Sequence, residues 1–423
     1  MSNEIKNREL EVVQERDVLA EELGVDVVVD TTQVRENFIE VGVIGCGNTG
    51  GQNAAIAFTQ YNIPAVVINS SSRDLETITD QIPKFLIGTG KGSGKDRDLG
   101  REYFLSSAMN LIEEEEIVNL IDKCDVISIQ FSLGGGQGSS AGPILYNLLK
   151  ETYTDKVFIM QVVAPSNDDM LVGQQHSIDC MTEILADTPD ATYLVYDNAK
   201  FPELNTRELY NRVNNNIAKD LAILRGDFIS LTDLDGIDEE ELIGVCATPG
   251  RMAVGYLEDF TDYGITGSLP NTLKEVINNE SAHAVLENDN VITSSALIYT
   301  VNQDDTDLVG NVKLDVQNVF GPHIKDYRNE DVSMLESALN NAYIILAGLS
   351  EPTTRLKAMI ARKKEIERSV VQSRSSHTSV LDTKAVRSKK PESIISKYTQ
   401  KVKPATENGT AKPSAADILK RYK

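Results

Sequence analysis

The sequence contains little of the two residue types on which many metal and nucleophilic sites depend. Among 423 residues there are only four cysteines and four histidines. The cysteines are scattered and form no Cys-x-x-Cys pair: Cys46, Cys124, Cys180 and Cys246. No histidine falls at a metal-ligand spacing. We therefore expect reduced thiols rather than a disulfide framework or a zinc site, and no catalysis built on histidine, cysteine or zinc.

Basic residues and long apolar runs are also scarce. Lysine and arginine number 41 against 64 acidic residues, so the net charge is −23. Such a body is poorly suited to neutralising the phosphate backbone of a nucleic acid. No apolar stretch approaches the about 20 residues that span a bilayer, and the first residues are polar and of mixed charge, unlike a signal or transit peptide. We expect a cytoplasmic protein without membrane contact.

Hydrophobic residues make up 41% of the chain, which is enough for sizeable cores. From Phe38, apolar stretches such as VGVIG (41–45), IPAVVIN (63–69) and DVISIQFSL (125–133) alternate with helix-like segments. This alternation predicts an α/β fold with a mostly parallel, doubly wound sheet. Three later strand-like stretches indicate a second, smaller α/β region: AVGYLE (253–258), VITSSALIYTV (291–301) and NAYIILAGL (341–349).

These patterns divide the chain into six segments. We expect an acidic amphipathic helix at 1–38, a first α/β domain at 39–203, a long linking helix at 204–226, a second α/β domain at 227–350, a charged helix at 351–373 and a basic tail at 374–423. The first helix packs on the body or serves as an arm for a partner. The tail has no core-forming pattern, so we expect it to be disordered. Its last ten residues, SAADILKRYK, could form a short helix that serves as a docking peptide.

A glycine cluster, Gly45 to Gly51, lies between the first strand and a helix expected to begin near Gln52. Glycines let the backbone turn tightly, and the free N–H groups of a helix start suit phosphate. The cluster also fits the dinucleotide fingerprint G-x-G-x-x-G. That fingerprint needs an acidic residue at the end of the next strand, where this chain has Asn69 to Ser72. A glycine turn without a ligand is the remaining alternative.

A second glycine cluster, Leu133 to Pro143, follows a later strand and opens a helix. Two glycine loops at two strand ends suit a triphosphate held from both sides. The cluster is not a Walker P-loop, because no GK[ST] follows the glycines.

At these residues the sequence resembles the tubulin/FtsZ superfamily. GGGQGSS (134–140) looks like the family signature GGGTGTG at five of seven positions, counting Ser for Thr. Four other stretches are similar to family motifs in the same order: VGVIGCGNTGGQNA to the first nucleotide loop, IGTGKGSGKDRDLGR to the loop that senses the γ-phosphate, YDNAK to a guanine-contacting strand end and IDEEEL to the catalytic loop. The likeness runs from Val41 to the helix after Pro352.

Within the superfamily, the sequence is most similar to the TubZ/PhuZ group of phage and plasmid tubulins. The features that carry this likeness are the DNAK stretch, the Thr-Pro-Gly at 248–250 and the long charged helix after AGL-x-x-P. The resemblance implies a tubulin/FtsZ-like fold, in which 39–203 is the GTP-binding domain and 227–350 the activation domain. It also implies GTP/GDP and Mg²⁺ as cofactors.

The resemblance assigns nucleotide-binding roles residue by residue. The residues are Gly45, Gly47, Asn48, Thr49, Gly51, Gln52, Asn53, Asn69, Ser70, Ser93, Gly94, Gly134, Gly135, Gly136, Gln137, Gly138, Ser139, Asn198, Tyr210 and Asn214. The Ser139 hydroxyl would contact phosphate and Asn198 the guanine. Tyr210 and Asn214 lie four apart on one helix face, where they would stack on the base and read its edge. A core role for Tyr210 is the structural alternative.

The same resemblance makes Asp238 and Glu241 the catalytic pair, with no protein residue assigned to a metal. In the family, one subunit's loop projects onto the nucleotide of the next. A carboxylate there accepts a hydrogen bond from the attacking water. The structural alternative is that both acids simply favour a helix start.

Three residues depart from the family pattern. Gln137 replaces the first threonine of the signature, Ser140 replaces its last glycine, and Gly236 stands where the family has an asparagine. If position 140 requires a positive φ, a serine costs about 1 kcal/mol there. These departures leave hydrolysis less certain than binding.

The function that follows from the resemblance is a GTPase that polymerises head to tail into dynamic filaments and positions plasmid or phage DNA or phage particles. The partners are other copies of the chain, and the basic tail could contact DNA, an adaptor or the acidic face of a neighbour. Two alternatives stay open: a nucleotide-binding structural filament with little hydrolysis, and a Rossmann-type dinucleotide-dependent enzyme.

Overall fold

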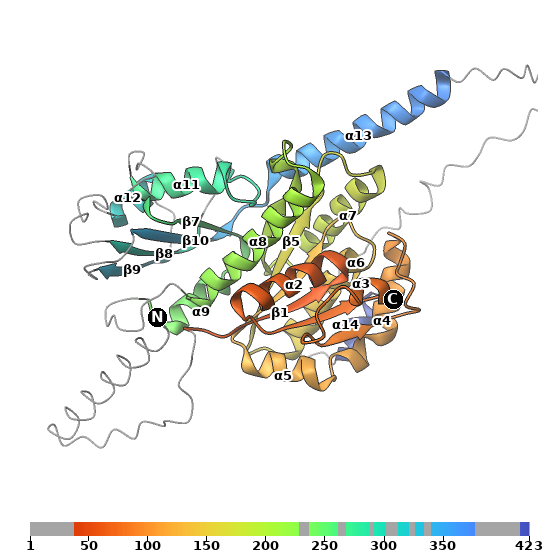
Figure 1. Ribbon diagram of the computed structural model, residues 1–423, viewed down its shortest axis with the longest axis horizontal. Coiled ribbons are helices and arrows are strands. Elements are labelled where there is room, and N and C mark those ends of the chain that lie inside the picture. The colour runs from red at the N-terminus through yellow and green to blue at the C-terminus, as the bar shows by residue number, and fades with distance from the viewer. Residues whose placement is uncertain are drawn as a thin grey trace, which may run out of the picture. The chain divides into compact units, whose positions relative to one another are not determined.

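The computed structural model describes residues 38–227, 237–260, 268–287, 292–301, 312–320, 326–333, 340–376 and 415–422. Figure 1 labels the elements along these ranges. The helix predicted at 1–38 lies almost wholly outside the described residues, as do Gly236 and most of the basic tail. Among the described helices, none is long and apolar enough to cross a membrane.

Six parallel strands form the first part of the sheet. In sheet order they are β3 (Lys84–Leu86), β2 (Ala65–Asn69), β1 (Val41–Cys46), β4 (Val126–Ser132), β5 (Val157–Ala164) and β6 (Thr192–Asp197). Each pairs with its neighbour in parallel. This arrangement confirms the predicted α/β fold. It also brings the carboxyl ends of all these strands to one edge of the sheet.

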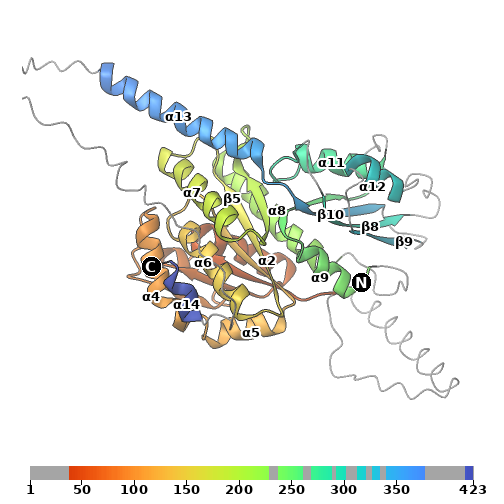
Figure 2. The same ribbon diagram turned by 180° about the vertical axis from the view of Figure 1, so that it is seen from behind.

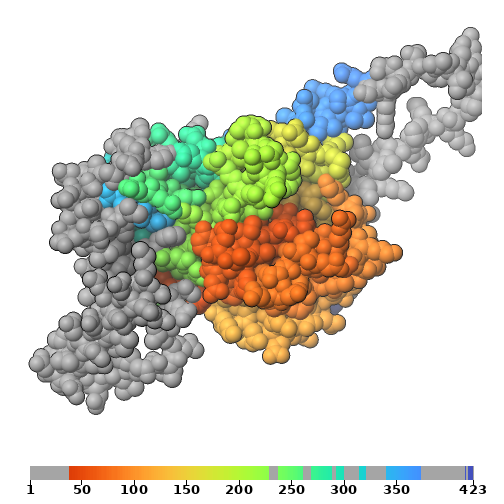
Figure 3. All heavy atoms as spheres, in the orientation of Figure 1, coloured from red at the N-terminus to blue at the C-terminus, as the bar shows by residue number. Residues whose placement is uncertain are grey.

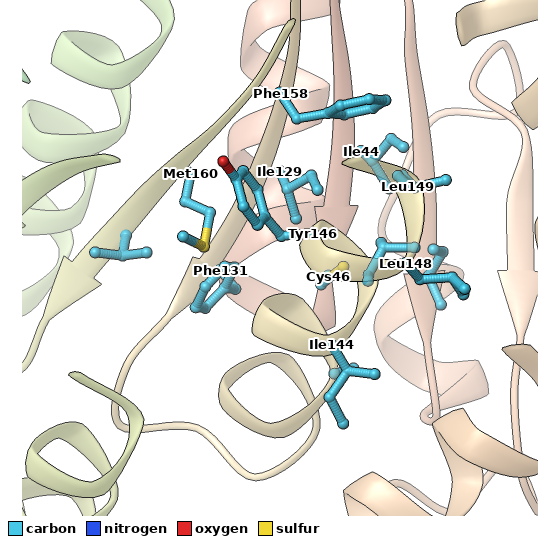
Figure 4. Close-up of a cluster of buried hydrophobic side chains, with 14 of the residues drawn as sticks. Ile44, Cys46, Ile129, Phe131, Ile144, Tyr146, Leu148, Leu149, Phe158 and Met160 are labelled. Atoms are coloured by element: carbon cyan, nitrogen blue, oxygen red, sulfur yellow. The ribbon is translucent and has the colours of Figure 1, made fainter. Parts of the chain in front are cut away.

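Side chains of these strands alternate between two hydrophobic clusters, because successive residues of a strand point to opposite faces. Val41 and Val43 join the first cluster, which α2 (Gly47–Tyr61) and α8 (Thr206–Arg225) cover. Figure 3 shows these two helices side by side on one face. Ile44 and Cys46 join the second cluster, shown in Figure 4. It is covered by α4 (Arg97–Leu111), α5 (Glu115–Lys123), α6 (Gln137–Thr152) and α7 (Leu171–Asp187).

The four cysteines are free and buried. Burial raises the pKa of each thiol to about 12. All four belong to the hydrophobic clusters of the body, and the Cys180 thiol also donates to the Ser139 carbonyl at 3.2 Å.

Helix α2 begins at Gly47, earlier than the expected start near Gln52. The glycines read as a turn are in fact its first residues. A Cβ on Gly50 would lie 2.1 Å from the Gln130 carbonyl oxygen of β4. Because that atom is absent, the helix packs directly on the sheet. The sequence pattern does not distinguish such a glycine-rich helix start from a turn.

The second α/β region continues the same sheet. β7 (Gly250–Leu257) pairs in parallel with β6, and β10 (Asn341–Leu349) is antiparallel to both β7 and β8 (Ser294–Val301). The edge strand β9 (Asp326–Ser333) was not predicted. Its sequence, DYRNEDVS, is charged and lacks an apolar alternation, as is common at sheet edges. Helices α11 (Leu269–Asn279) and α12 (Val312–Phe320) pack with β7, β8 and β10 in a third hydrophobic cluster.

Helix α8 corresponds to the long helix expected at 204–226. Asn205 caps its first turn in a capping box with Glu208, and Gly226 ends it at φ +82°. The middle of α8 contains three consecutive asparagines, Asn214, Asn215 and Asn216. Asn216 is buried, donates to the Tyr256 hydroxyl (3.0 Å) and accepts from the Ala282 N–H (2.6 Å). Asn216 therefore has a structural role, since it joins α8 to β7.

Two helices follow the sheet. α13 (Thr353–Ser376) packs against α7, and α14 (Ala415–Lys420) lies against α6 and α4 (Figure 2). The prediction of a disordered tail over 374–423 is wrong for residues 374–376, which belong to α13, and for residues 415–422, which pack on the body. The short helix considered for SAADILKRYK is present as α14.

We expect Asn216→Ala to lower the free energy of unfolding by about 1–3 kcal/mol, because it leaves a buried N–H and a partly buried hydroxyl without their partner. Asn215→Ala is the matched control. Asn215 is exposed and accepts a single hydrogen bond, from Gln60. Asn215→Ala should therefore lower the free energy of unfolding by no more than about 0.5 kcal/mol. Urea unfolding of both variants measures the difference, and equal losses would contradict this role for Asn216.

Candidate functional site

A cavity of about 510 Å³ lies at the carboxyl edge of the parallel strands. Residues that directly follow β1, β2, β4, β5 and β6 line it. The chain leaves β1 toward β2 on one side and later returns to β4 on the other. In open α/β sheets, ligands bind at this kind of switch point. Here the two glycine loops follow the two strands that flank it.

The two glycine loops touch each other. Gly47 has φ +72°, and a Cβ there would lie 3.1 Å from the Gln137 Oε1 atom and from the Gly138 nitrogen. A Cβ on Gly138 would lie 2.7 Å from the Cys46 carbonyl oxygen. Only glycine allows this approach, which aligns the starts of α2 and α6 on one space. Helix starts present free N–H groups that suit phosphate oxygens.

A third loop, residues 91–95, closes this end of the cavity. A Cβ on Gly136 would lie 2.4 Å from the Ser93 Oγ atom, so the loop lies directly against the second glycine loop. Lys91 and Lys95 both line the cavity and bring positive charge to a strongly acidic chain. Lys95 has φ +64°, which is unusual for a residue with a side chain.

Asn198, Tyr210 and Asn214 line the other end of the cavity. Asn198 directly follows β6, whereas Tyr210 and Asn214 come from α8. Tyr210 is 48% exposed, so it is not a core residue. An aromatic ring at the rim beside two amides can stack on a flat base and hydrogen-bond its edge.

Several buried polar atoms at the cavity have no hydrogen-bond partner among the described residues. They are Oγ of Ser70, Oδ1 of Asn198, and both amide atoms of Gln137. Each of these residues is less than 10% exposed. Buried polar groups are normally paired, so this lining fits a polar ligand that contacts both ends of the cavity.

Most of the nucleotide-binding residues expected from the sequence line this one cavity. They are Gly47, Asn48, Thr49, Gln52, Asn69, Ser70, Ser93, Gly94, Gly134, Gly135, Gly136, Gln137, Gly138, Asn198, Tyr210 and Asn214. The residues that do not are Gly45, Gly51, Asn53 and Ser139. Gly45 and Gly51 are packing positions, since their missing Cβ atoms would approach Gly50 and Val67. Asn53 is completely buried.

Ser139 does not present its hydroxyl to the cavity, contrary to expectation. The hydroxyl donates to the Gly135 carbonyl (2.5 Å) and accepts from Nε of Arg97 (3.1 Å). Arg97 in turn pairs with Glu183 of α7 at 2.7 Å. Burial and the nearby Arg97 lower the pKa of His176 on the same helix. The Ser139 hydroxyl therefore shapes the loop rather than lining the cavity.

Ser140 carries no backbone strain, so the cost expected for a positive φ does not arise. It lies in the first turn of α6, and its hydroxyl donates to the Gly136 carbonyl at 2.8 Å. Gln137, the other departure in this loop, lies at the helix start and lines the cavity.

The cavity also contains residues that motif matching missed, above all Lys91, Lys95, Asp74 and Asp169. The two lysines lie inside the quoted stretch IGTGKGSGKDRDLGR. Asp169 lies in the loop after β5, and its carboxylate accepts from the Ser166 N–H at 3.1 Å. The rule that ligands bind at the carboxyl ends of parallel strands could have identified this loop.

Asp238 and Glu241 are not at the cavity. They form a capping box at the start of α9 (Glu239–Cys246): the Asp238 carboxylate accepts from the Glu241 N–H at 2.7 Å, and the Glu241 carboxylate accepts from the Asp238 N–H at 3.2 Å. Within one chain, the two acids therefore have the helix-start role that the sequence offered as the alternative.

Comparison with known proteins agrees with this site. Residues 37–206 match the tubulin/FtsZ family, GTPase domain. The tubulin-like protein CetZ of Pyrococcus abyssi is 28% identical over 229 residues, which cover 51% of this chain and 60% of that protein. The tubulin-like protein TubZ of Clostridium botulinum C phage is 25% identical over 223 residues, covering 51% and 58%. The chain thus aligns with about three fifths of the length of these relatives.

A solved structure confirms the tubulin/FtsZ-like fold. It is the GTPγS-form protofilament of TubZ from Bacillus thuringiensis serovar israelensis, with a TM-score of 0.65, 18% identity, and coverage of 81% of this chain and 96% of that one. The dinucleotide interpretation of the first glycine cluster finds no support in these comparisons. Residues 37–206 of this chain are therefore identified with the GTPase domain of the tubulin/FtsZ family.

Proposed function

We propose that this chain binds GTP in the cavity, polymerises head to tail, and hydrolyses GTP at the contact between subunits. One observation carries the proposal. The cavity lies at the carboxyl edge of the parallel strands, whereas the acidic pair Asp238 and Glu241 lies at the start of α9, outside it. The site is therefore incomplete within one chain.

The sheet register supports this separation. Helix α9 leads into β7, whose first residue, Gly250, pairs with Thr192, the first residue of β6. The Thr192 hydroxyl also donates to the Thr248 carbonyl, just after α9 (2.8 Å). Asn198 of the cavity follows the opposite end of β6. Six residues of strand separate the two ends by about 20 Å.

A second copy stacked with its amino edge on this carboxyl edge would bring Asp238 and Glu241 to the cavity. Such a contact joins two different surfaces, so it can repeat from copy to copy, and it generates an open filament where the rotation between copies closes no ring. The relative of known structure from Bacillus thuringiensis is a GTPγS-form protofilament, which supports this mode of assembly.

In the proposed reaction, the chain contributes position and charge. The glycine loops hold the phosphates through N–H groups, Lys91 and Lys95 offset their charge, and the carboxylates from the neighbour orient the attacking water. Among the described residues, no group of three or more His, Cys, Asp or Glu could hold a metal. Mg²⁺ would therefore enter with the phosphates, its usual mode in such sites, and neutralise their charge.

The cargo is a finer part of the proposal. The likeness to a phage TubZ supports a cytoplasmic filament that positions plasmid or phage DNA or phage particles, directly or through an adaptor that binds the basic tail. Co-sedimentation of filaments with DNA, compared with a chain whose tail lysines at 389 and 390 are replaced by glutamate, tests a direct contact. Equal DNA recovery with the two chains would show that this part of the tail does not bind DNA.

Exchanging both acids for amides, Asp238→Asn with Glu241→Gln, should lower phosphate release about 10²-fold or more while filaments still form. Asn and Gln preserve the capping box, so α9 keeps its start. Light scattering with parallel phosphate release, after addition of GTP and Mg²⁺ at several protein concentrations, measures both properties.

Glu240→Gln is the control, since it makes one such acid-to-amide exchange at an exposed neighbouring position. Its rate should stay within about twofold of the parent. Phosphate release that does not increase with polymer would contradict the trans site. Scattering without phosphate release in the parent would instead favour a structural filament, in which the departure at Gln137 has left binding without hydrolysis.

Gln137→Glu should weaken GTPγS binding tenfold or more, because it places a carboxylate beside the phosphates. An acid at a helix start does not impair α6 itself. Affinity for guanosine, which has no phosphate, should be unchanged. Competition binding with both ligands measures the two affinities, and an equal loss for guanosine would exclude Gln137 from the phosphate end.

A further inference from the structure

Helix α14 and the two residues after it are bound to the outside of the GTPase domain by a small set of contacts. Ile418 and Leu419 are only 1% and 4% exposed and belong to the second hydrophobic cluster. The helix lies against α6 and α4 (Figure 2). We refer to the surface of these two helices beneath α14 as the α4–α6 face.

Two polar contacts fix the orientation of α14 on this face. The Tyr422 hydroxyl accepts from the Asn147 Nδ2 atom at 2.6 Å, and Arg421 pairs with Glu151 at 3.0 Å. Asn147 and Glu151 lie four residues apart on α6, hence on one side of it. The face therefore offers an apolar floor, an amide and a carboxylate, which match an Ile-Leu pair, a tyrosine and an arginine.

Helix α14 is too short to be stable alone. It has six residues, whereas isolated helices below about 12–15 residues are marginal in water. Its helical form therefore depends on the contacts with the α4–α6 face. Folding and docking of this segment are one event, and they reverse together.

The chain between α13 and α14 does not force the contact. Residues 377–414 could reach roughly 130 Å if fully extended, and their sequence is rich in Ser, Thr, Lys and Pro. The helix stays on the body because the side chains fit. A connection of this length adds only an effective concentration to that fit.

We propose that the α4–α6 face is a peptide-binding site whose ligand is the segment 415–422 of the same chain, a short basic amphipathic segment built on α14 that docks and releases as a unit. The docked state conceals Ile418 and Leu419. A partner that reads these side chains must first displace the helix from the face. The site is separate from the nucleotide cavity, so this inference does not rest on the proposed GTPase function.

A labelled peptide with the sequence AKPSAADILKRYK tests the site by fluorescence anisotropy. The receptor is the full chain carrying Ile418→Asp and Leu419→Asp, which empties its own face. We expect the peptide to bind this variant at least tenfold more tightly than the parent chain, whose face is already occupied. A peptide with the same two aspartates should bind neither. Equal binding to both chains, or none to the folded variant, would overturn the proposal.

A charge exchange tests the docked orientation. Adding Glu151→Lys to the receptor should lower its affinity for the peptide about two- to fivefold. A peptide with Arg421→Glu should restore the affinity. Absence of this rescue would overturn the orientation given by the Arg421–Glu151 pair.

If the aspartate variant does not fold, the full chain with Arg421→Glu serves as the receptor. Arg421 is 58% exposed, so its replacement leaves the core intact and only loosens the helix. This receptor should bind the parent peptide several-fold more tightly than the parent chain does. Binding no tighter than to the parent chain would again overturn the proposal.

Discussion

The contact between the two glycine loops is the constraint on which the rest of the site depends. Gly47 and Gly138 let two backbones meet where any side chain would hold them apart. Because these loops follow β1 and β4, the neighbouring strands at the centre of the parallel part, their contact directs α2 and α6 toward one space. The flanking strands then add the residues of the two ends. A cavity long enough for a base and a phosphate chain is thus a consequence of strand order.

The sequence predicts those parts of the fold whose signals are local and repeated. The apolar strands of the parallel sheet, the long helix α8 and the two glycine loops all follow from period and glycine position. Edge strand β9 could not be predicted in this way, because its sequence is charged and shows no apolar alternation. The sequence suggests a short helix at α14, but not the face of the body on which it packs.

The motifs identified which loops form the site more accurately than which side chains of those loops face the cavity. Motif matching could not separate residues that face the cavity from those behind it, because both belong to the same motif. Ser139 is bound to Arg97 and the Gly135 carbonyl, and Asn53 is buried. Conversely, Lys91 and Lys95 face the cavity between matched positions. Which side chain points inward is decided by packing between loops distant in sequence, which a linear pattern does not encode.

One feature of the sheet has a mechanical consequence. β6 and β7 are joined by three residue pairs, against six between β5 and β6. This short seam lies between the strands that support the cavity and those that follow α9. Two side chains strengthen the connection at these residue pairs. Asn216 links α8 to β7, and the buried Arg251 donates to the Ala284 and Ser350 carbonyls. In the proposed filament, load passing from the strands that support the cavity to those that follow α9 crosses these three residue pairs.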